Sequence, residues 1–171
     1  DWLSFTAYND SWRPMREAFR WFLEAHHGTV YQEIFFNQHV KFQYPPSSLL
    51  LFALPRRIGI PTTDFGLNMV GWTAVLIEAL AVSALFWLAV RRIAKPQRSQ
   101  WPVVAGAALA GVMTIIFYPV VRAYSLGQIQ AWLSAMFAVA ALAYFLDRRV
   151  LAGALIGGIC LMKPQFGLFL I

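Results

Sequence analysis

The stretch FGLNMVGWTAVLIEALAVSALFWLAV, residues 65–90, decides the fold of this chain. Its only ionisable side chain is Glu78, and as a helix of about 26 residues it reaches about 39 Å, enough to cross a bilayer with some tilt. The composition agrees, because 59% of the 171 residues are hydrophobic and 13% are charged, whereas about a quarter are charged in soluble proteins. The sequence therefore predicts an all-α integral membrane protein and excludes a soluble globular domain.

Three further apolar runs predict additional transmembrane helices. They cover about residues 101–121, 126–146 and 150–162, and the last run meets Lys163-Pro164, where proline ends or kinks a helix. Together with the first run they define an expected transmembrane region, residues 65–171. Because the chain starts at Asp1 without methionine and stops inside an apolar run, we expect a fragment truncated at both ends.

Residues 1–64 are the least hydrophobic part of the chain and form the second expected region, an extramembrane loop. Pro14 follows Asp10 and Ser11, which suit the start of a helix. Apolar side chains then recur at helical spacing, namely Met15, Ala18, Phe19, Phe22 and Leu23. The pattern predicts an amphipathic helix that lies on the membrane surface and ends at Gly28.

The motif Lys41-Phe-Gln-Tyr-Pro-Pro46 forces an extended backbone, because consecutive prolines exclude a helix. The apolar run after it, residues 47–54, is too short to span a bilayer and is stopped by Pro55-Arg56-Arg57. We expect a juxtamembrane or half-inserted helix there rather than a crossing.

The short loops predict the orientation. Residues 91–100 and 147–149 hold six Lys or Arg between them, whereas residues 122–125 and the turn at Lys163 hold one each. Basic residues mark the cytoplasmic side, so residues 1–64, the Arg122 turn and the Lys163-Pro164 break are expected on the opposite, extracytoplasmic face.

This topology brings four unusual groups to one membrane surface, namely Asp10, Tyr44-Pro45-Pro46, residues 122–130 and Lys163-Pro164-Gln165. Taken singly, each has a structural explanation as a helix cap, a turn, a snorkelling cation or an interfacial anchor. Together, the cations would hold a phosphate and the carboxylate would deprotonate an acceptor hydroxyl. That combination suits a sugar donor carried on a lipid phosphate.

The order of these motifs resembles glycosyltransferase family 87, a branch of the GT-C superfamily that includes phosphatidylinositol-mannoside mannosyltransferases. The resemblance rests on Phe-Gln-Tyr-Pro-Pro before a Leu-rich helix, Tyr-Ser-Leu-Gly-Gln at the head of a span, Asp-Arg-Arg, Leu-Ala-Gly-Ala-Leu-Ile-Gly-Gly, and finally Lys-Pro. It implies a multi-pass mannosyltransferase of a cell membrane, expected in the inner membrane of a bacterium. The donor would be a polyprenyl-phosphate sugar, the acceptor a lipid or glycan, and no metal or other cofactor is assigned.

The resemblance also implies roles for individual residues. The base is Asp10 by its spacing from the amphipathic helix, with Asp1 as a competitor, and Lys163 would contact the donor phosphate. The family's Gly-Gln-x-Asn appears as Gly127-Gln128-Ile129-Gln130, so an amide is retained in place of Asn. The remaining expected substrate-binding residues are Tyr44, Pro45, Pro46, Arg122, Tyr124, Gln128 and Gln130.

Glu78 and three histidines are the other ionisable candidates. Glu78 lies near the middle of the first span, where an ionisable residue is either functional or paired with another helix. His26, His27 and His39 lack the spacing and the acidic or Cys partners of a metal site. The net charge of +6 follows the membrane topology instead of forming one patch, so no nucleic-acid partner is expected.

Two alternatives to an enzyme stay open at this point. One is a fragment of a transporter or flippase, which would place its charges at mid-bilayer on broken helices, often in repeats that this sequence lacks. The other is a non-catalytic membrane subunit, whose outer loop would need no essential acid.

Overall fold

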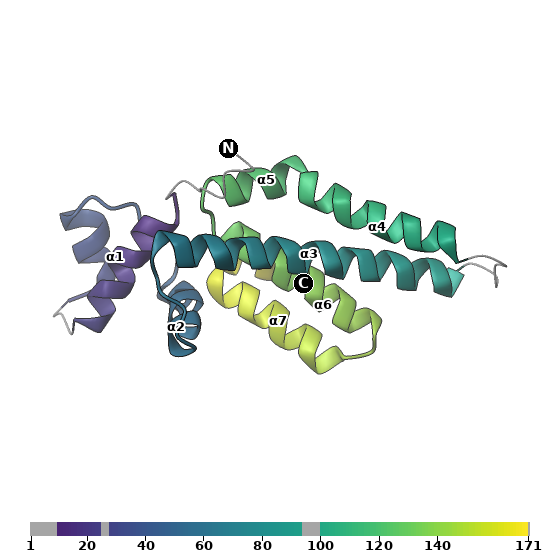
Figure 1. The fold of residues 1–171 in the computed structure, drawn as a ribbon. Helices are drawn as coiled ribbons and strands as arrows, with labels where there is room; N and C mark the ends of the chain where they lie inside the picture. The colour runs from purple at the N-terminus through teal and green to yellow at the C-terminus, as the bar shows by residue number, and fades with distance from the viewer. Residues whose placement is uncertain (1–9, 25–27, 94–99, 171) are drawn as a thin grey trace.

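The computed structural model describes residues 10–24, 28–93 and 100–170, and within these ranges all regular structure is helical (Figure 1). The all-α prediction is confirmed. The long helix α3 is the axis of the fold, with α4 packed along one side and the hairpin of α6 and α7 along the other. The shorter α1 and α2 gather around the N-terminal end of α3.

Helix α3, Asp64–Ile93, has 30 residues and is about 45 Å long. It extends beyond the predicted residues 65–90 because its last turn is held by its neighbours. The guanidinium of Arg92 lies 4.3 Å from the ring centroid of Phe145 and donates a hydrogen bond of 3.1 Å to the Phe145 carbonyl. Arg91 lies over the Trp87 ring at 4.6 Å.

Within the described part of the chain, α3 is the one helix that is long and apolar enough to cross a membrane by itself. Helices α4, Trp101–Ile116, and α5, Tyr118–Ser125, pass the same test if the bent pair forms one span. Helices α6, Gln130–Phe145, and α7, Arg149–Met162, are apolar but have 16 and 14 residues. They reach about 24 and 21 Å, less than the bilayer core of about 30 Å.

The continuous helix predicted for residues 101–121 is wrong. The chain bends by 44° at Phe117, whose backbone is extended with a ψ of 120°. Pro119, in the first turn of α5, has no N–H to donate and its ring excludes the carbonyl four residues earlier. Helix α5 then continues through Ser125, so the turn lies at residues 126–129 and not at 122–125 as predicted.

Helix α1, Trp12–Leu23, confirms the amphipathic helix but ends before Gly28, with Glu24 as its last capping residue. Met15 and Ala18 are fully buried against the protein, whereas Phe22 and Leu23 are exposed. Only the last turn of the predicted apolar face is therefore free to contact lipid.

A π-helix, η2 (Tyr31–Asn37), follows α1 and leads into the extended segment predicted for residues 41–46, which ends one residue earlier because Pro46 starts a 3-10 helix. The next helices are the 3-10 turn η3, Pro46–Leu49, and α2, Leu50–Arg57. Helix α2 includes Pro55 and ends at Arg57, within the predicted stop at residues 55–57, because a proline near the end of a helix removes only one backbone hydrogen bond. The chain turns at Gly59, whose φ is +82°.

Aromatic side chains join the first region to the helical hairpin. The rings of Trp12 and Trp132 lie 4.9 Å apart between centroids, and Phe52 lies 6.3 Å from Trp12 and 6.5 Å from Trp132. These three side chains are at most 5% exposed. This shared core fixes the start of α1 and helix α2 against the start of α6.

Candidate functional site

A polar cavity of about 610 Å³ lies where three distant segments of the chain meet. The segments are Asp10, two residues before α1, the extended segment before η3, and the break between α7 and the 3-10 helix η4, Pro164–Leu170. The cavity is lined by Asp10, Lys41, Gln43, Tyr44, Pro45, Lys163, Pro164 and Gln165. Three of the four groups predicted to meet at one surface line this cavity, and the fourth, residues 122–130, bonds to two of its lining residues.

Asp10 is fixed through both its backbone and its side chain. Its N–H donates to the Leu126 carbonyl at 3.1 Å, and the N–H of Ser11 donates to the Gly127 carbonyl at 3.2 Å. The Nε2 of Gln128 donates to Asp10 Oδ2 at 3.1 Å. Ser11 makes no side-chain cap, so the carboxylate is positioned by the α5–α6 turn rather than by α1.

Tyr44 holds the extended segment in place beside Asp10. Its hydroxyl pairs with Ser11 Oγ at 2.8 Å, and its carbonyl accepts a hydrogen bond of 2.6 Å from the Tyr31 hydroxyl. Phe42 is fully buried and stacks on the Tyr31 ring at 5.8 Å. The aromatic side chains anchor the segment while its polar side chains line the cavity.

Lys163 follows the last turn of α7, where Pro164 prevents further α-helix. Its Nζ donates to Gln130 Oε1 at 2.9 Å and lies 6.0 Å from the ring centroid of Phe166. Burial lowers the pKa of this ammonium group from its usual value, because a desolvated charge is less stable. Within the described residues Lys163 and Asp10 form no ion pair, so both charges remain available to a ligand.

The turn of residues 127–130 connects the acid to the cation. Gln128 binds Asp10 and Gln130 binds Lys163, so two amides one residue apart orient the two charged groups. Gly127 makes the turn possible, since its φ of +61° is a conformation that other residues rarely adopt. A cavity with this lining can hold a phosphate on its lysines and present a carboxylate to a hydroxyl group.

The other predicted site residues lie elsewhere. Arg122 is exposed and does not line the cavity. Tyr124 is buried against Trp72, with ring centroids 5.1 Å apart, and packs with Val75. Pro46 starts η3 behind the lining residue Pro45.

The remaining candidates are Asp1, the competing base, and the three histidines, which the sequence did not assign to a metal site. Asp1, His26 and His27 lie outside the described residues. Within the described ranges, no three His, Cys, Asp or Glu side chains are grouped as metal ligands, and His39 is exposed.

Sequence reasoning missed Lys41 and Gln43 as lining residues. Side chains of an extended segment alternate between two sides, and buried Phe42 already indicates which side is the core. That alternation places Lys41, Gln43 and Pro45 together on the opposite side, where the cavity lies.

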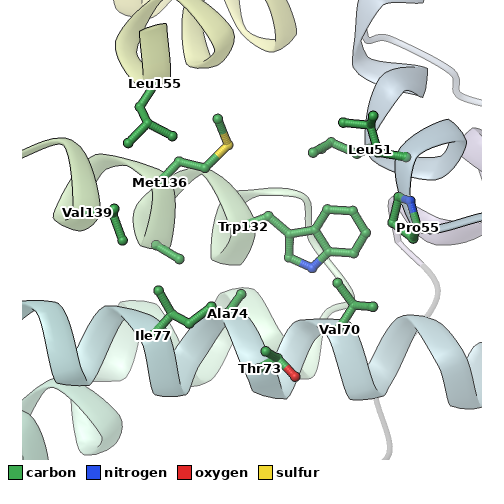
Figure 2. A pocket seen from close by; sticks show the side chains of 12 residues that line it. Leu51, Pro55, Val70, Thr73, Ala74, Ile77, Trp132, Met136, Val139 and Leu155 are labelled. Atoms are coloured by element: carbon green, nitrogen blue, oxygen red, sulfur yellow. The ribbon is translucent and has the colours of Figure 1, made fainter. Parts of the chain in front are cut away.

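Two less polar cavities adjoin the helices. One of about 390 Å³ is lined by Glu78, Ser134 and apolar residues of α3, α6 and α7, and it includes Gln130 and Phe166, the two contacts of Lys163. The other, of about 350 Å³, lies between α2, α3, α6 and α7 (Figure 2). In the second, Thr73 is the one hydroxyl side chain, and it bonds to the Met69 carbonyl. That pocket has no acid, base or phosphate ligand.

A comparison with protein families matches the chain to Glycosyltransferase family 87 over residues 42–171. The match includes Tyr44, Lys163 and the turn of residues 127–130, whereas Asp10 precedes it. No curated protein and no solved structure matches the chain. The family match favours the predicted transferase over a transporter or a non-catalytic subunit. Because it covers more than half of the chain, this protein belongs to glycosyltransferase family 87 and is an enzyme that moves a sugar from a donor to an acceptor.

Proposed function

We propose that this enzyme transfers a hexose, mannose in the branch it resembles, from a polyprenyl-phosphate donor to a hydroxyl of a lipid or glycan acceptor. The observation that carries the proposal is the polar cavity, which combines one carboxylate with two lysines. Phosphate recognition needs the cations, and activation of a hydroxyl needs the carboxylate. The cavity lined by Glu78 offers a carboxylate without a lining lysine or arginine.

In the reaction, the acceptor oxygen attacks the anomeric carbon of the sugar while the Asp10 carboxylate takes the hydroxyl proton. The bond between the anomeric carbon and the phosphate oxygen breaks, and polyprenyl phosphate leaves with one more negative charge. Lys163 and Lys41 line the same cavity and stabilise that charge as it develops. Gln128 and Gln130 keep acid and cation in position throughout.

The prenyl chain of the donor extends from the phosphate into the cavity lined by Glu78. Gln130 and Phe166 contact Lys163 and also line that cavity. The two cavities therefore adjoin at Lys163, the residue proposed to hold the phosphate. Leu85, Leu133 and Phe137 contribute apolar surface suited to hydrocarbon. This arrangement keeps the charged end of the donor in the polar cavity and its tail among apolar helices.

Residues 1–64 form the extracytoplasmic part of the enzyme, and residues 65–171 form its multi-pass region in a cell membrane. The basic residues at 91, 92, 148 and 149 then mark the cytoplasmic ends of α3 and α7. The polar cavity lies at the other end of α7, next to Lys163. Sugar transfer therefore takes place at the extracytoplasmic face.

The choice of donor tests this function directly. The full-length protein, reconstituted in vesicles, is given either polyprenyl-phospho-mannose or a nucleotide-activated mannose, together with a membrane lipid extract as acceptor. We expect transfer of radiolabelled mannose from the prenyl donor only. Transfer from the nucleotide sugar in the absence of any prenyl phosphate would refute the proposed donor class.

A further inference from the structure

A second charged cavity, about 390 Å³ in volume, lies on the outer side of α1. We call it the arginine pocket, and it is lined by Arg16, Glu17, Phe19, Arg20, Leu23, Arg56, Thr62 and Thr63. These residues come from α1, from α2 and from the segment before α3. The arginine pocket shares no lining residue with the polar cavity, so what it binds does not depend on the proposed reaction.

The charges of the arginine pocket favour an anion. Arg16 pairs with Asp64 at 2.8 Å and Arg20 pairs with Glu17 at 3.2 Å. Arg56 has no carboxylate partner among the described residues, and its guanidinium lies over the Phe19 ring at 5.8 Å. The pocket thus holds an unneutralised guanidinium, a group whose planar donors match phosphate oxygens.

Hydroxyl groups complete the polar wall. The Thr63 Oγ1 accepts a hydrogen bond of 3.2 Å from the N–H of Gly66, which leaves its O–H free to donate elsewhere. Thr62 supplies a second hydroxyl on the same wall. Guanidinium and hydroxyl donors therefore converge on one space from different elements of the fold.

Exposed apolar side chains on the two helices that line the arginine pocket, Leu23 of the pocket wall among them, favour a lipid over a free ion as the ligand. Phe22, Leu23, Leu54 and Ile58 are between 49% and 77% exposed and belong to the same two helices, α1 and α2, or to the turn after them. Exposed apolar side chains next to arginines are typical of protein surfaces that contact anionic lipid. A free phosphate would leave these side chains in water.

We propose that the arginine pocket binds the phosphate of an anionic phospholipid headgroup, with the acyl chains lying along Phe22, Leu23, Leu54 and Ile58. Arg56 and Arg20 hold the phosphate, and the threonine hydroxyls bind its remaining oxygens. Bound lipid fastens α1 and α2 to the membrane surface beside the polar cavity.

The test is a titration of the full-length protein in neutral detergent with short-chain phosphatidylglycerol, followed by calorimetry. We expect Arg56→Gln to weaken binding about tenfold, which corresponds to the loss of one charge-assisted hydrogen bond. Arg56→Lys keeps the charge and retains part of the affinity. Arg148→Gln, at an exposed arginine of the α6–α7 loop, is the matched control and binds like the unmodified protein.

Two further probes distinguish the sources of the anion. Short-chain phosphatidylcholine, whose headgroup carries its own cation, binds more weakly, and inorganic phosphate at the same concentration does not displace the lipid. Equal binding of both lipids, or displacement by inorganic phosphate, would overturn the lipid site. Arg20→Gln repeats the measurement in case Arg56→Gln fails to fold, and unchanged affinity in a folded variant of either residue also refutes the proposal.

Discussion

Asp10 combines rigid placement with an oxygen that is still available. Two backbone hydrogen bonds tie residues 10 and 11 to the α5–α6 turn, and the amide of Gln128 occupies Oδ2. Within the described structure Oδ1 has no hydrogen-bond donor, so it can accept a proton from a bound hydroxyl. A fixed carboxylate with one open oxygen is the arrangement that general-base catalysis needs.

Asp10→Asn should lower kcat by about 10² or more while donor binding remains, because the variant keeps the shape and loses only the basic oxygen. The Gln128 amide can still donate to the carbonyl oxygen of the substituted side chain, so folding is preserved. Turnover and donor affinity are measured separately in the purified enzyme. Asp147→Asn, at an exposed aspartate of the opposite loop, is the control and keeps full activity.

Asp1 offers the alternative base, and the same assay separates the two. If Asp1→Asn abolishes turnover and Asp10→Asn does not, the carboxylate mechanism stands with a different residue. Full activity in both variants would remove an aspartate base from the mechanism.

Lys163 gives the reaction a predictable pH dependence. Burial lowers the pKa of this group below its ordinary value of 10.5, and only the protonated form attracts phosphate. Donor capture, measured as kcat/KM for the free enzyme, therefore falls as the pH rises through the lowered pKa. Lys163→Arg keeps its charge at high pH, so the alkaline fall should move upwards or disappear. Lys163→Met should lower kcat/KM in the pH range where the lysine is charged and should remove the alkaline fall.

Ionisation of Tyr31 does not contribute to this pH dependence of kcat/KM. Burial raises the pKa of its hydroxyl above the ordinary 10.0, so the hydrogen bond that it donates to the Tyr44 carbonyl persists in the alkaline range. An alkaline fall that is the same in Lys163→Arg as in the unmodified enzyme would show that another group controls donor capture.

At the scale of the elements, the α5–α6 turn is the piece on which the polar cavity depends. Gly127→Ala forces a side chain into a φ of +61° and should cost about 1–2 kcal/mol of stability. Gly153→Ala is the matched control, because a Cβ at Gly153 in α7 meets nothing within 4 Å and alanine favours helix. Thermal unfolding in detergent should show a lower Tm for the first variant and an equal or higher Tm for the second. Equal Tm values for the unmodified protein and both variants would mean that alanine at position 127 does not strain the turn.

The helices could be predicted from the sequence where neighbouring residues determine them. The apolar spacing around Met15 and Ala18 and the Lys163-Pro164 break are properties of neighbouring residues. The first corresponds to helix α1, although not to its end, and the second to the end of α7. The bend at Phe117 was missed because hydrophobicity continues across it, although Pro119 carried the signal. The stop predicted at residues 55–57 is another local signal, and α2 ends there at Arg57.

The candidate site was predictable as a meeting of segments but not as a set of contacts. Loop charge and topology suffice to bring Asp10, Tyr44 and Lys163 to one end of the fold. The bonds from Gln128 to Asp10 and from Gln130 to Lys163 depend on how α6 is rotated, which only packing around Trp132 decides. Tyr124 is buried against Trp72 in a separate cluster with Val75 and Val120, which the sequence pattern also did not reveal.

At the scale of the whole molecule, the two ends of α3 differ in the residues that gather around them. Arg91, Arg92 and Arg149 lie at the end formed by the C-terminus of α3 and the start of α7. The polar cavity and the arginine pocket lie towards the other end, where α1 and α2 gather. If the arginine-marked end is cytoplasmic, both ligand sites face the opposite side of the membrane.

Cysteine labelling in intact cells tests that orientation. The background is Cys160→Ala, which removes the chain's single, partly buried cysteine. Gln100→Cys, at an exposed position before α4, should react only with a membrane-permeant maleimide, whereas Gln32→Cys, exposed on η2, should also react with an impermeant one. The physical reason is the basic character of residues 91–98, which retains that loop on the cytoplasmic side. Lysed cells, in which both positions react with either reagent, supply the control for reactivity. Labelling of Gln100→Cys by the impermeant reagent in intact cells would invert the orientation and place sugar transfer on the cytoplasmic side, where a nucleotide-activated donor is accessible.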